Sequence, residues 1–166
     1  MDKITKKIEM VANVAIILAA SAILVVLVRS YFLERKIPDS PEIAIGTTIS
    51  IPNVDVSKKH QTLILALKKG CKYCTESATF YQRLFKEIEE RGKTQLVIVS
   101  PNEQQDAKSY LAGLGLNPSL IVQVSLNSIQ VKGTPTLLLV DNKGNLTSQW
   151  VGKLSPNSEA EVLAKM

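Results

Sequence analysis

The feature that most constrains the fold is an apolar run of nineteen residues at positions 10–28, which contains no charged side chain. Only Asn13 and Ser21 interrupt it with polar groups. A helix of this length, rising about 1.5 Å per residue, covers close to the roughly 30 Å hydrocarbon core of a bilayer. The run therefore predicts a single N-terminal transmembrane helix, which we place at residues 10–31.

Basic and aromatic side chains follow the run, a mixture that is typical of the point where a helix leaves a membrane. They are Arg29, Tyr31, Phe32, Arg35 and Lys36. The alternative is a cleaved signal peptide, because a basic segment precedes the run and Ala20-Ser21-Ala22 resembles a cleavage site. The run continues for six residues beyond Ala22, whereas the apolar part of a signal peptide ends just before the cleavage site. We therefore favour an uncleaved anchor.

The orientation of this anchor is only weakly encoded. Three lysines precede the run and three basic residues follow it, so the positive-inside rule gives nearly a tie. The free amino terminus favours residues 1–9 as a short cytoplasmic segment. We therefore expect a single-pass protein of the inner (cytoplasmic) membrane, whose soluble domain faces the periplasm or extracytoplasmic space.

The rest of the chain has the composition of one globular domain. The 166 residues are 45% hydrophobic and 21% charged, which is typical of a folded chain and sufficient for one core. The formal net charge is +5, but residues 34–166 hold sixteen basic and thirteen acidic residues, a balance of only +3. These charges alternate without a basic stripe, so we expect no nucleic-acid partner.

The body, residues 46–166, follows a proline-containing linker at residues 32–45 and alternates strand and helix patterns. Strands are predicted at 43–51, 62–67, 95–100, 120–124, 136–140 and 146–151, the last two as a hairpin. Helices are predicted from Cys71 to Gly92, at 103–111, and after Ser155-Pro156. This order predicts an α/β fold in which a mixed sheet is flanked by helices on both faces.

The chain has two cysteines, Cys71 and Cys74, and they lie between a predicted buried strand and a predicted helix. At a helix N-terminus, unpaired backbone N–H groups stabilise the thiolate form of the first cysteine. Lys68, Lys69 and Lys72 lie within three residues of Cys71, and any of them near the sulfur would lower its pKa. Cys71 is therefore the candidate attacking thiol, and Cys74 the candidate thiol that resolves a mixed disulfide.

Three other interpretations of the pair stay open at this point. A structural disulfide that closes a four-residue loop stabilises by about 2 kcal/mol, against about 3 kcal/mol for a fifteen-residue loop. A zinc site needs four ligands, and His60 is the sole histidine, so two chains would have to share the metal. The third interpretation is two inert buried thiols.

A second motif, Gly133-Thr134-Pro135-Thr136, stands directly before the apolar strand at 137–140. Gly144 lies in the hairpin turn, and Gly152-Lys153-Leu154 precedes the last helix. Together with the CxxC pair, these motifs resemble the thioredoxin superfamily over roughly residues 46–166. With the anchor and the segment Gly46-Thr47-Thr48-Ile49, the chain is most similar to the membrane-tethered TlpA/ResA type of thiol-disulfide oxidoreductase.

This resemblance implies that Pro135 is cis and packs beside Cys71, that the Thr134 backbone pairs with an extended substrate segment, and that Lys72 and Tyr73 face the substrate. The proline would keep metal off the thiols, so we expect neither a metal nor another cofactor. The implied function is exchange of disulfides in extracytoplasmic proteins by a monomer, with a membrane electron donor or acceptor. The alternative is a redox-inactive binding or assembly module at the membrane.

The chain also departs from the thioredoxin pattern around the cysteines. Gly70 stands where many members have tryptophan, and Tyr73 stands where they have proline. Leu65 occupies the position of a buried acid that relays a proton. Glu76 is a candidate replacement for that acid, and with Lys68 and Lys69 a candidate for tuning the Cys71 pKa. The alternative for Glu76 is an ordinary solvated helix acid.

Overall fold

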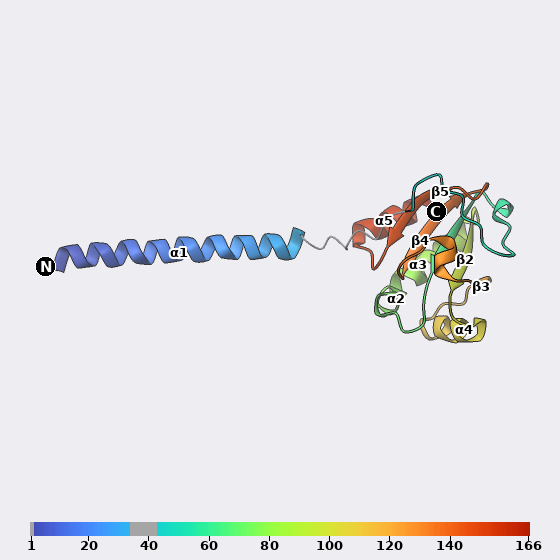
Figure 1. Ribbon diagram of the computed structural model, residues 1–166, viewed down its shortest axis with the longest axis horizontal. Coiled ribbons are helices and arrows are strands. Elements are labelled where there is room, and N and C mark those ends of the chain that lie inside the picture. The colour runs from blue at the N-terminus through green and yellow to red at the C-terminus, as the bar shows by residue number, and fades with distance from the viewer. Residues whose placement is uncertain (1, 34–42) are drawn as a thin grey trace. The chain divides into compact units, whose positions relative to one another are not determined.

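The computed structural model describes residues 2–33 and 43–166, and the chain divides into two compact units, Met1–Asp39 and Ser40–Met166 (Figure 1). The first unit contains one helix, α1 (Asp2–Leu33). Over the residues that the structure describes, no helix combines the length and apolar character that a membrane crossing requires. The transmembrane span at residues 10–31 stays a prediction, and most of the linker predicted at 32–45 lies outside the described residues.

The second unit is built on a five-stranded mixed sheet in the order β3-β2-β1-β4-β5 (Figure 1). Its strands are β1 (Gln61–Ala66), β2 (Thr94–Ser100), β3 (Ile121–Gln123), β4 (Thr136–Asp141) and β5 (Leu146–Val151). The first three strands run parallel, while β4 is antiparallel to both β1 and β5. The central strand β1 is buried from Thr62 to Ala66, as its continuous apolar sequence predicted.

The α-helices of this unit pack on one face of the sheet. They are α2 (Lys72–Glu76), α3 (Ala78–Arg91), α4 (Gln104–Gly113) and α5 (Pro156–Lys165). In α3, buried Tyr81, Leu84 and Ile88 recur at helical spacing, and Gly92 ends the helix in the left-handed conformation, as predicted. The predicted helix from Cys71 to Gly92 is interrupted at Ser77, which separates α2 from α3.

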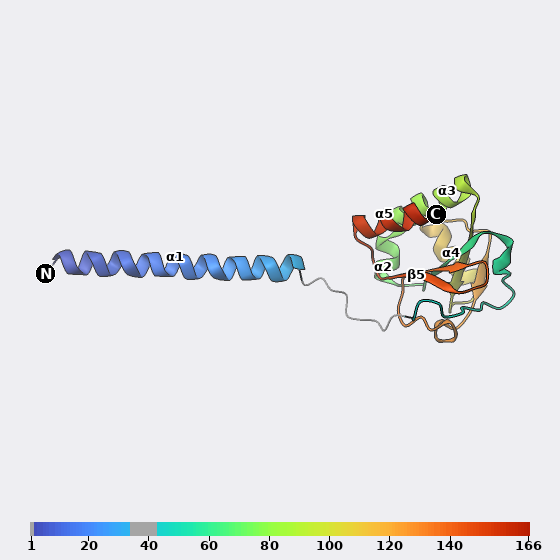
Figure 2. The same cartoon turned by 90° about the horizontal axis from the view of Figure 1, so that it is seen from above.

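Helices on both faces were expected, and this part of the prediction was wrong. Among the described residues, the core cluster on the second face draws nothing from α2–α5. It is covered instead by the segments 43–58 and 120–131, whose only helical turns are the short 3-10 turns η1 (Val56–Lys58) and η2 (Leu126–Ile129). Figure 2 shows these segments below the sheet and α2, α3 and α5 above it.

The edge strand predicted at 43–51 is also absent from the described structure. This segment follows β5 through the bonds Gly46 N–H to Leu146 O and Leu146 N–H to Thr47 O, both 2.8 Å. Its single bridge joins Thr48 to Asn145. Gly46, at φ +88°, turns the chain away from extended geometry, so a regular ladder does not form. The strands expected near 62–67, 95–100, 120–124, 136–140 and 146–151 are confirmed.

Candidate functional site

The cysteine pair lies where β1 leaves the sheet. Gly70 adopts φ +79°, a conformation that other residues rarely take, and no atom crowds the position of an added Cβ there. Backbone geometry therefore explains a glycine at the position where the sequence pattern led us to look for tryptophan. The turn closes through the Cys71 N–H, which donates to the Lys68 carbonyl at 3.2 Å, and α2 begins at the next residue.

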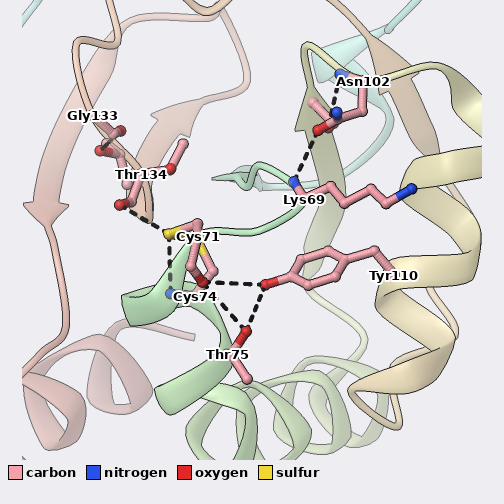
Figure 3. Close-up of a disulfide and its surroundings, with 10 residues drawn as sticks. Lys69, Cys71, Cys74, Thr75, Asn102, Tyr110, Gly133 and Thr134 are labelled. Carbon is pink, nitrogen blue, oxygen red and sulfur yellow. Dashed lines mark hydrogen bonds between the residues drawn. A yellow bond between two sulfur atoms is a disulfide. The ribbon is translucent and has the colours of Figure 1, made fainter.

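Cys71 and Cys74 form a disulfide, with their Cα atoms 5.2 Å apart (Figure 3). Cys71 is the N-cap of α2, and its Sγ accepts a hydrogen bond from the Cys74 backbone N–H at 3.2 Å. Cys71 is half-buried, whereas Cys74 is fully buried in the helical core. The two sulfurs thus differ in access, and only the first one can be reached from outside without movement of the core.

The loop that carries the second sequence motif lies beside the sulfur of Cys71. The carbonyl oxygen of Thr134 lies 3.3 Å from Cys71 Sγ, and the Thr134–Pro135 peptide bond is cis, as the resemblance implied (Figure 3). Pairing of Ala66 with Thr136 brings the ends of β1 and β4 together. The loop is also held by the Gly152 N–H, which donates to the Pro135 carbonyl at 2.7 Å.

A polar cluster from α4 supports the start of α2, and the sequence patterns did not identify it. The Tyr110 hydroxyl lies 3.0 Å from Thr75 Oγ1 and donates to the Cys71 carbonyl at 3.5 Å. On the other side of the loop, the Lys69 N–H donates to Asn102 Oδ1 at 2.9 Å (Figure 3). Helical spacing predicts that Tyr110 lies on α4, but no signal in the sequence pairs it with Thr75.

Of the predicted tuning residues, Lys69 and Glu76 form ion pairs with other side chains. Lys69 Nζ is 3.1 Å from Asp106, and Glu76 binds Lys153 at 2.9 Å and Lys72 at 3.8 Å. The hydrogen bond from Lys153 lowers the pKa of the Glu76 carboxyl below its ordinary value. Among the described residues, no lysine side chain donates to either sulfur, so an effect of Lys68, Lys69 or Glu76 on the Cys71 pKa stays a prediction.

Leu65 is fully buried in the same core cluster as Cys74. It occupies the position where the thioredoxin pattern led us to seek a proton-relaying acid. The same core cluster contains the buried phenol of Tyr81, whose pKa is raised because burial disfavours its charged form. Tyr73, by contrast, is 55% exposed. Its role toward a substrate, like those of Lys72, Thr134 and Pro135, stays a prediction.

No protein-family model matches the sequence, and no curated protein sequence matches it. Several solved structures resemble the fold. The thioredoxin domain of a thiol-disulfide oxidoreductase from Bacteroides vulgatus has a TM-score of 0.57 at 18% identity, covering 75% of this chain and 98% of that one. A thiol:disulfide interchange protein from Bacteroides sp. gives 0.59 at 17% identity, covering 75% and 90%. StoA from Bacillus subtilis gives 0.52 at 21% identity, covering 75% and 98%.

Similarity at this level of identity establishes a fold. It agrees with the geometry of the site, in which a CxxC pair at a strand-to-helix junction faces a cis-proline loop. The thioredoxin-like α/β fold that the motifs implied is thereby confirmed for the second unit of the chain, which shares it with the thiol-disulfide oxidoreductases that it matches.

Proposed function

We propose that this protein is a thiol-disulfide oxidoreductase that exchanges disulfides with protein substrates through Cys71 and Cys74. The observation that carries the proposal is the unequal setting of the two sulfurs. Cys71 is half-buried and accepts the Cys74 N–H at 3.2 Å, while Cys74 is fully buried behind it. A backbone donor favours the thiolate form of Cys71, which is the nucleophile in disulfide exchange.

In the reducing direction, the Cys71 thiolate attacks one sulfur of a substrate disulfide. A bond forms between Cys71 and the substrate, the substrate S–S bond breaks, and the departing sulfur leaves as a thiolate that takes up a proton. Cys74 then loses its proton and attacks the Cys71 sulfur, which forms the intramolecular disulfide and releases the second substrate thiol. Two electrons pass to the substrate. Oxidation of a substrate dithiol is the same sequence in reverse.

A trapping experiment tests this proposal directly. In a Cys74→Ala variant of the full chain, the second attack cannot occur, so mixed disulfides between Cys71 and substrate proteins should accumulate. The Cys71→Ala variant is the matched control, since its remaining thiol is fully buried and should trap little. Equal absence of mixed disulfides from both variants would favour the alternative, a binding or assembly module that does not use redox chemistry.

We further propose that residues 10–31 anchor the protein in the cytoplasmic membrane, with the cysteine pair on the extracytoplasmic side. The uncharged run at 10–28 supports this, as do the exposed apolar side chains of α1, among them Ile16, Leu18 and Leu24. The basic residues on both sides of the run suit a helix that ends at two interfaces.

Two measurements, one on isolated membranes and one on intact cells, test the anchor and its orientation. Alkaline carbonate should leave the full chain in the membrane pellet, whereas it removes proteins that are held only at the surface. After mild reduction, a membrane-impermeant maleimide should label Cys71 without lysis. Labelling that requires lysis would place the domain in the cytoplasm, and release by carbonate would contradict the anchor.

A further inference from the structure

Exposed lysines surround the cysteine pair at the end of the sheet where β1 and β2 finish and β4 begins. Eight charged side chains stand in the loops there, in α2 or at the start of α4, five basic and three acidic. They are Lys68, Lys69, Lys72, Glu76, Glu103, Asp106, Lys132 and Lys153. We refer to this set as the basic rim. Its balance of +2 accounts for a large share of the +3 carried by residues 34–166.

Ion pairs divide the basic rim into engaged and unengaged lysines. Asp106 pairs with Lys69, and the single carboxylate of Glu76 is shared between Lys72 and Lys153. Among the described residues, neither Lys68 nor Lys132 has a carboxylate within ion-pair distance. Among the described residues, Lys68 and Lys132 are therefore the lysines of the basic rim that no carboxylate pairs with, and Glu103 is its acidic side chain without an ion pair.

The two unengaged lysines stand on the two segments that meet at the reactive sulfur. The Lys68 carbonyl accepts the Cys71 N–H at 3.2 Å, so Lys68 lies one turn from the attacking sulfur. Lys132 precedes Thr134 by two residues, which places its backbone within about 8 Å of the Thr134 backbone. Because Thr134 O is 3.3 Å from Cys71 Sγ, the two lysines belong to the two loops that meet at this sulfur, each within three residues of a residue in that contact.

The surface around the cysteine pair offers little apolar area for binding a substrate. Within residues 43–166, Ile45 and Tyr73 are the large hydrophobic side chains that stand exposed, and Tyr73 alone belongs to the CxxC motif. One aromatic ring gives a substrate chain a single apolar contact, which leaves charge as the main property by which this surface can distinguish one partner from another.

We propose that the basic rim selects protein substrates whose reactive cysteine is flanked by acidic residues. This inference rests on the proposed exchange function and names its substrate class. Opposite charge raises the rate of encounter and orients the substrate chain between Lys68 and Lys132. Attraction of this kind commonly increases association rates by about 10- to 1,000-fold at low salt. Salt at 1 M reduces the screening length to about 3 Å and should remove the effect.

The test uses the reduced full chain in detergent and three peptides of equal length, each closed by one disulfide and carrying Glu, Gln or Lys beside its cysteines. We expect the Glu peptide to be reduced about tenfold faster than the Lys peptide at low salt, with the Gln peptide between them. At 1 M salt the ratio should approach one. The Gln peptide reports the exchange chemistry itself.

A matched pair of double variants localises the effect. Lys68→Glu combined with Lys132→Glu should reverse the Glu-to-Lys preference at low salt. Lys93→Glu combined with Lys143→Glu changes the total charge equally, but these residues lie at the opposite ends of β2 and β4, and the preference should persist. A loss of preference in both double variants would show that total charge, rather than the basic rim, selects the substrate, and would overturn the inference.

The remaining outcomes separate this inference from the function on which it rests. If the wild-type chain reduces all three peptides at the same rate, exchange stands and the basic rim has no selective role. If the reduced chain reduces none of the three peptides, and its disulfide form oxidises none of the same peptides in their dithiol form, both the exchange function and the inference are wrong.

Discussion

The sulfur of Cys71 accepts a hydrogen bond from the backbone N–H of Cys74 at 3.2 Å. This contact ties the chemistry of the pair to the backbone of α2, because the donor belongs to the first turn of the helix that Cys71 caps. The donor does not depend on any side chain, which explains how the site can be arranged without the tryptophan, proline and buried acid that the thioredoxin pattern led us to seek.

The first prediction concerns the acidity of Cys71 in the reduced protein. A backbone donor stabilises the thiolate, so the pKa of Cys71 should lie below the value of about 8.5 that is ordinary for a free thiol. Alkylation by iodoacetamide, followed against pH in the Cys74→Ala variant, measures it. The Cys71→Ala variant should react slowly at every pH, because Cys74 is fully buried. A Cys71 midpoint at or above 8.5 would remove the basis for calling it the attacking thiol.

The second prediction concerns the Tyr110 hydroxyl. Tyr110→Phe removes its contacts with Thr75 and with the Cys71 carbonyl, and should lower the free energy of unfolding by about 1 kcal/mol. Urea denaturation of the full chain, followed by a signal from residues 43–166 such as Trp150 fluorescence, measures it. Tyr73→Phe is the matched control, and because Tyr73 is 55% exposed its change should stay within about 0.5 kcal/mol. Equal effects of the two changes would contradict the support that we assign to Tyr110.

The third prediction concerns Glu76 and pH. Lys153 lowers the pKa of Glu76 in the folded state below its value in the unfolded chain. The stabilisation is therefore fully present above the unfolded-state pKa and is lost as the pH falls through the folded-state pKa. Wild type should be more stable than Glu76→Gln at pH 7, and this difference should vanish in strong acid. Lys153→Gln should remove most of the same pH dependence.

The same ion pairs bear on proton transfer. A carboxylate held by Lys153 at 2.9 Å and Lys72 at 3.8 Å stays ionised near neutral pH, so it is a poor carrier for the Cys74 proton. We expect Glu76→Gln to leave the pH dependence of peptide reduction unchanged. A shift of that profile by a full unit would restore Glu76 as the replacement for the missing acid.

The fourth prediction concerns Leu65, which is fully buried in β1. Introducing the acid by Leu65→Asp should destabilise the protein rather than improve its chemistry, because no described contact awaits a carboxylate in that core. The penalty should be larger at pH 7 than at pH 4, since burial disfavours the charged form. Leu65→Asn, which is similar in size and cannot ionise, should show no such pH dependence in urea denaturation. A Leu65→Asp protein as stable as Leu65→Asn at pH 7 would mean that the core accepts the charge.

Much of the fold was predictable because its signals are local. The buried strand β1, the spacing of Tyr81, Leu84 and Ile88, and the Ser155-Pro156 helix start are each written in a few neighbouring residues. The structure of the segment 43–51 could not be predicted in this way. It has the composition of a strand but pairs with its neighbour through only a few hydrogen bonds around Gly46. This segment covers the core cluster on the second face of the sheet, and the contacts that hold it there are not encoded in any short sequence pattern.

The candidate site likewise has a part that could be predicted from the sequence and a part that could not. The positions of Cys71, Cys74, Thr134 and Pro135 followed from two short motifs, and the structure brings Thr134 O within 3.3 Å of Cys71 Sγ. The contacts of Tyr110, Asn102 and Lys153 join residues far apart in sequence, and hydroxyl, amide and ammonium groups are common on any exposed helix or loop. The effect of the neighbouring lysines on the Cys71 pKa stays a prediction for a related reason, because proximity in sequence does not fix where a long side chain such as that of Lys69 forms its ion pair.

The measurement that tests the account most directly is the redox equilibrium of the full chain against defined glutathione or dithiothreitol buffers, read as the fraction of Cys71–Cys74 disulfide. The account predicts one reversible two-electron transition of this pair, within the range of about −270 to −120 mV that exchange proteins occupy. A disulfide that stays closed at potentials below about −300 mV would be structural, and would contradict the proposed function.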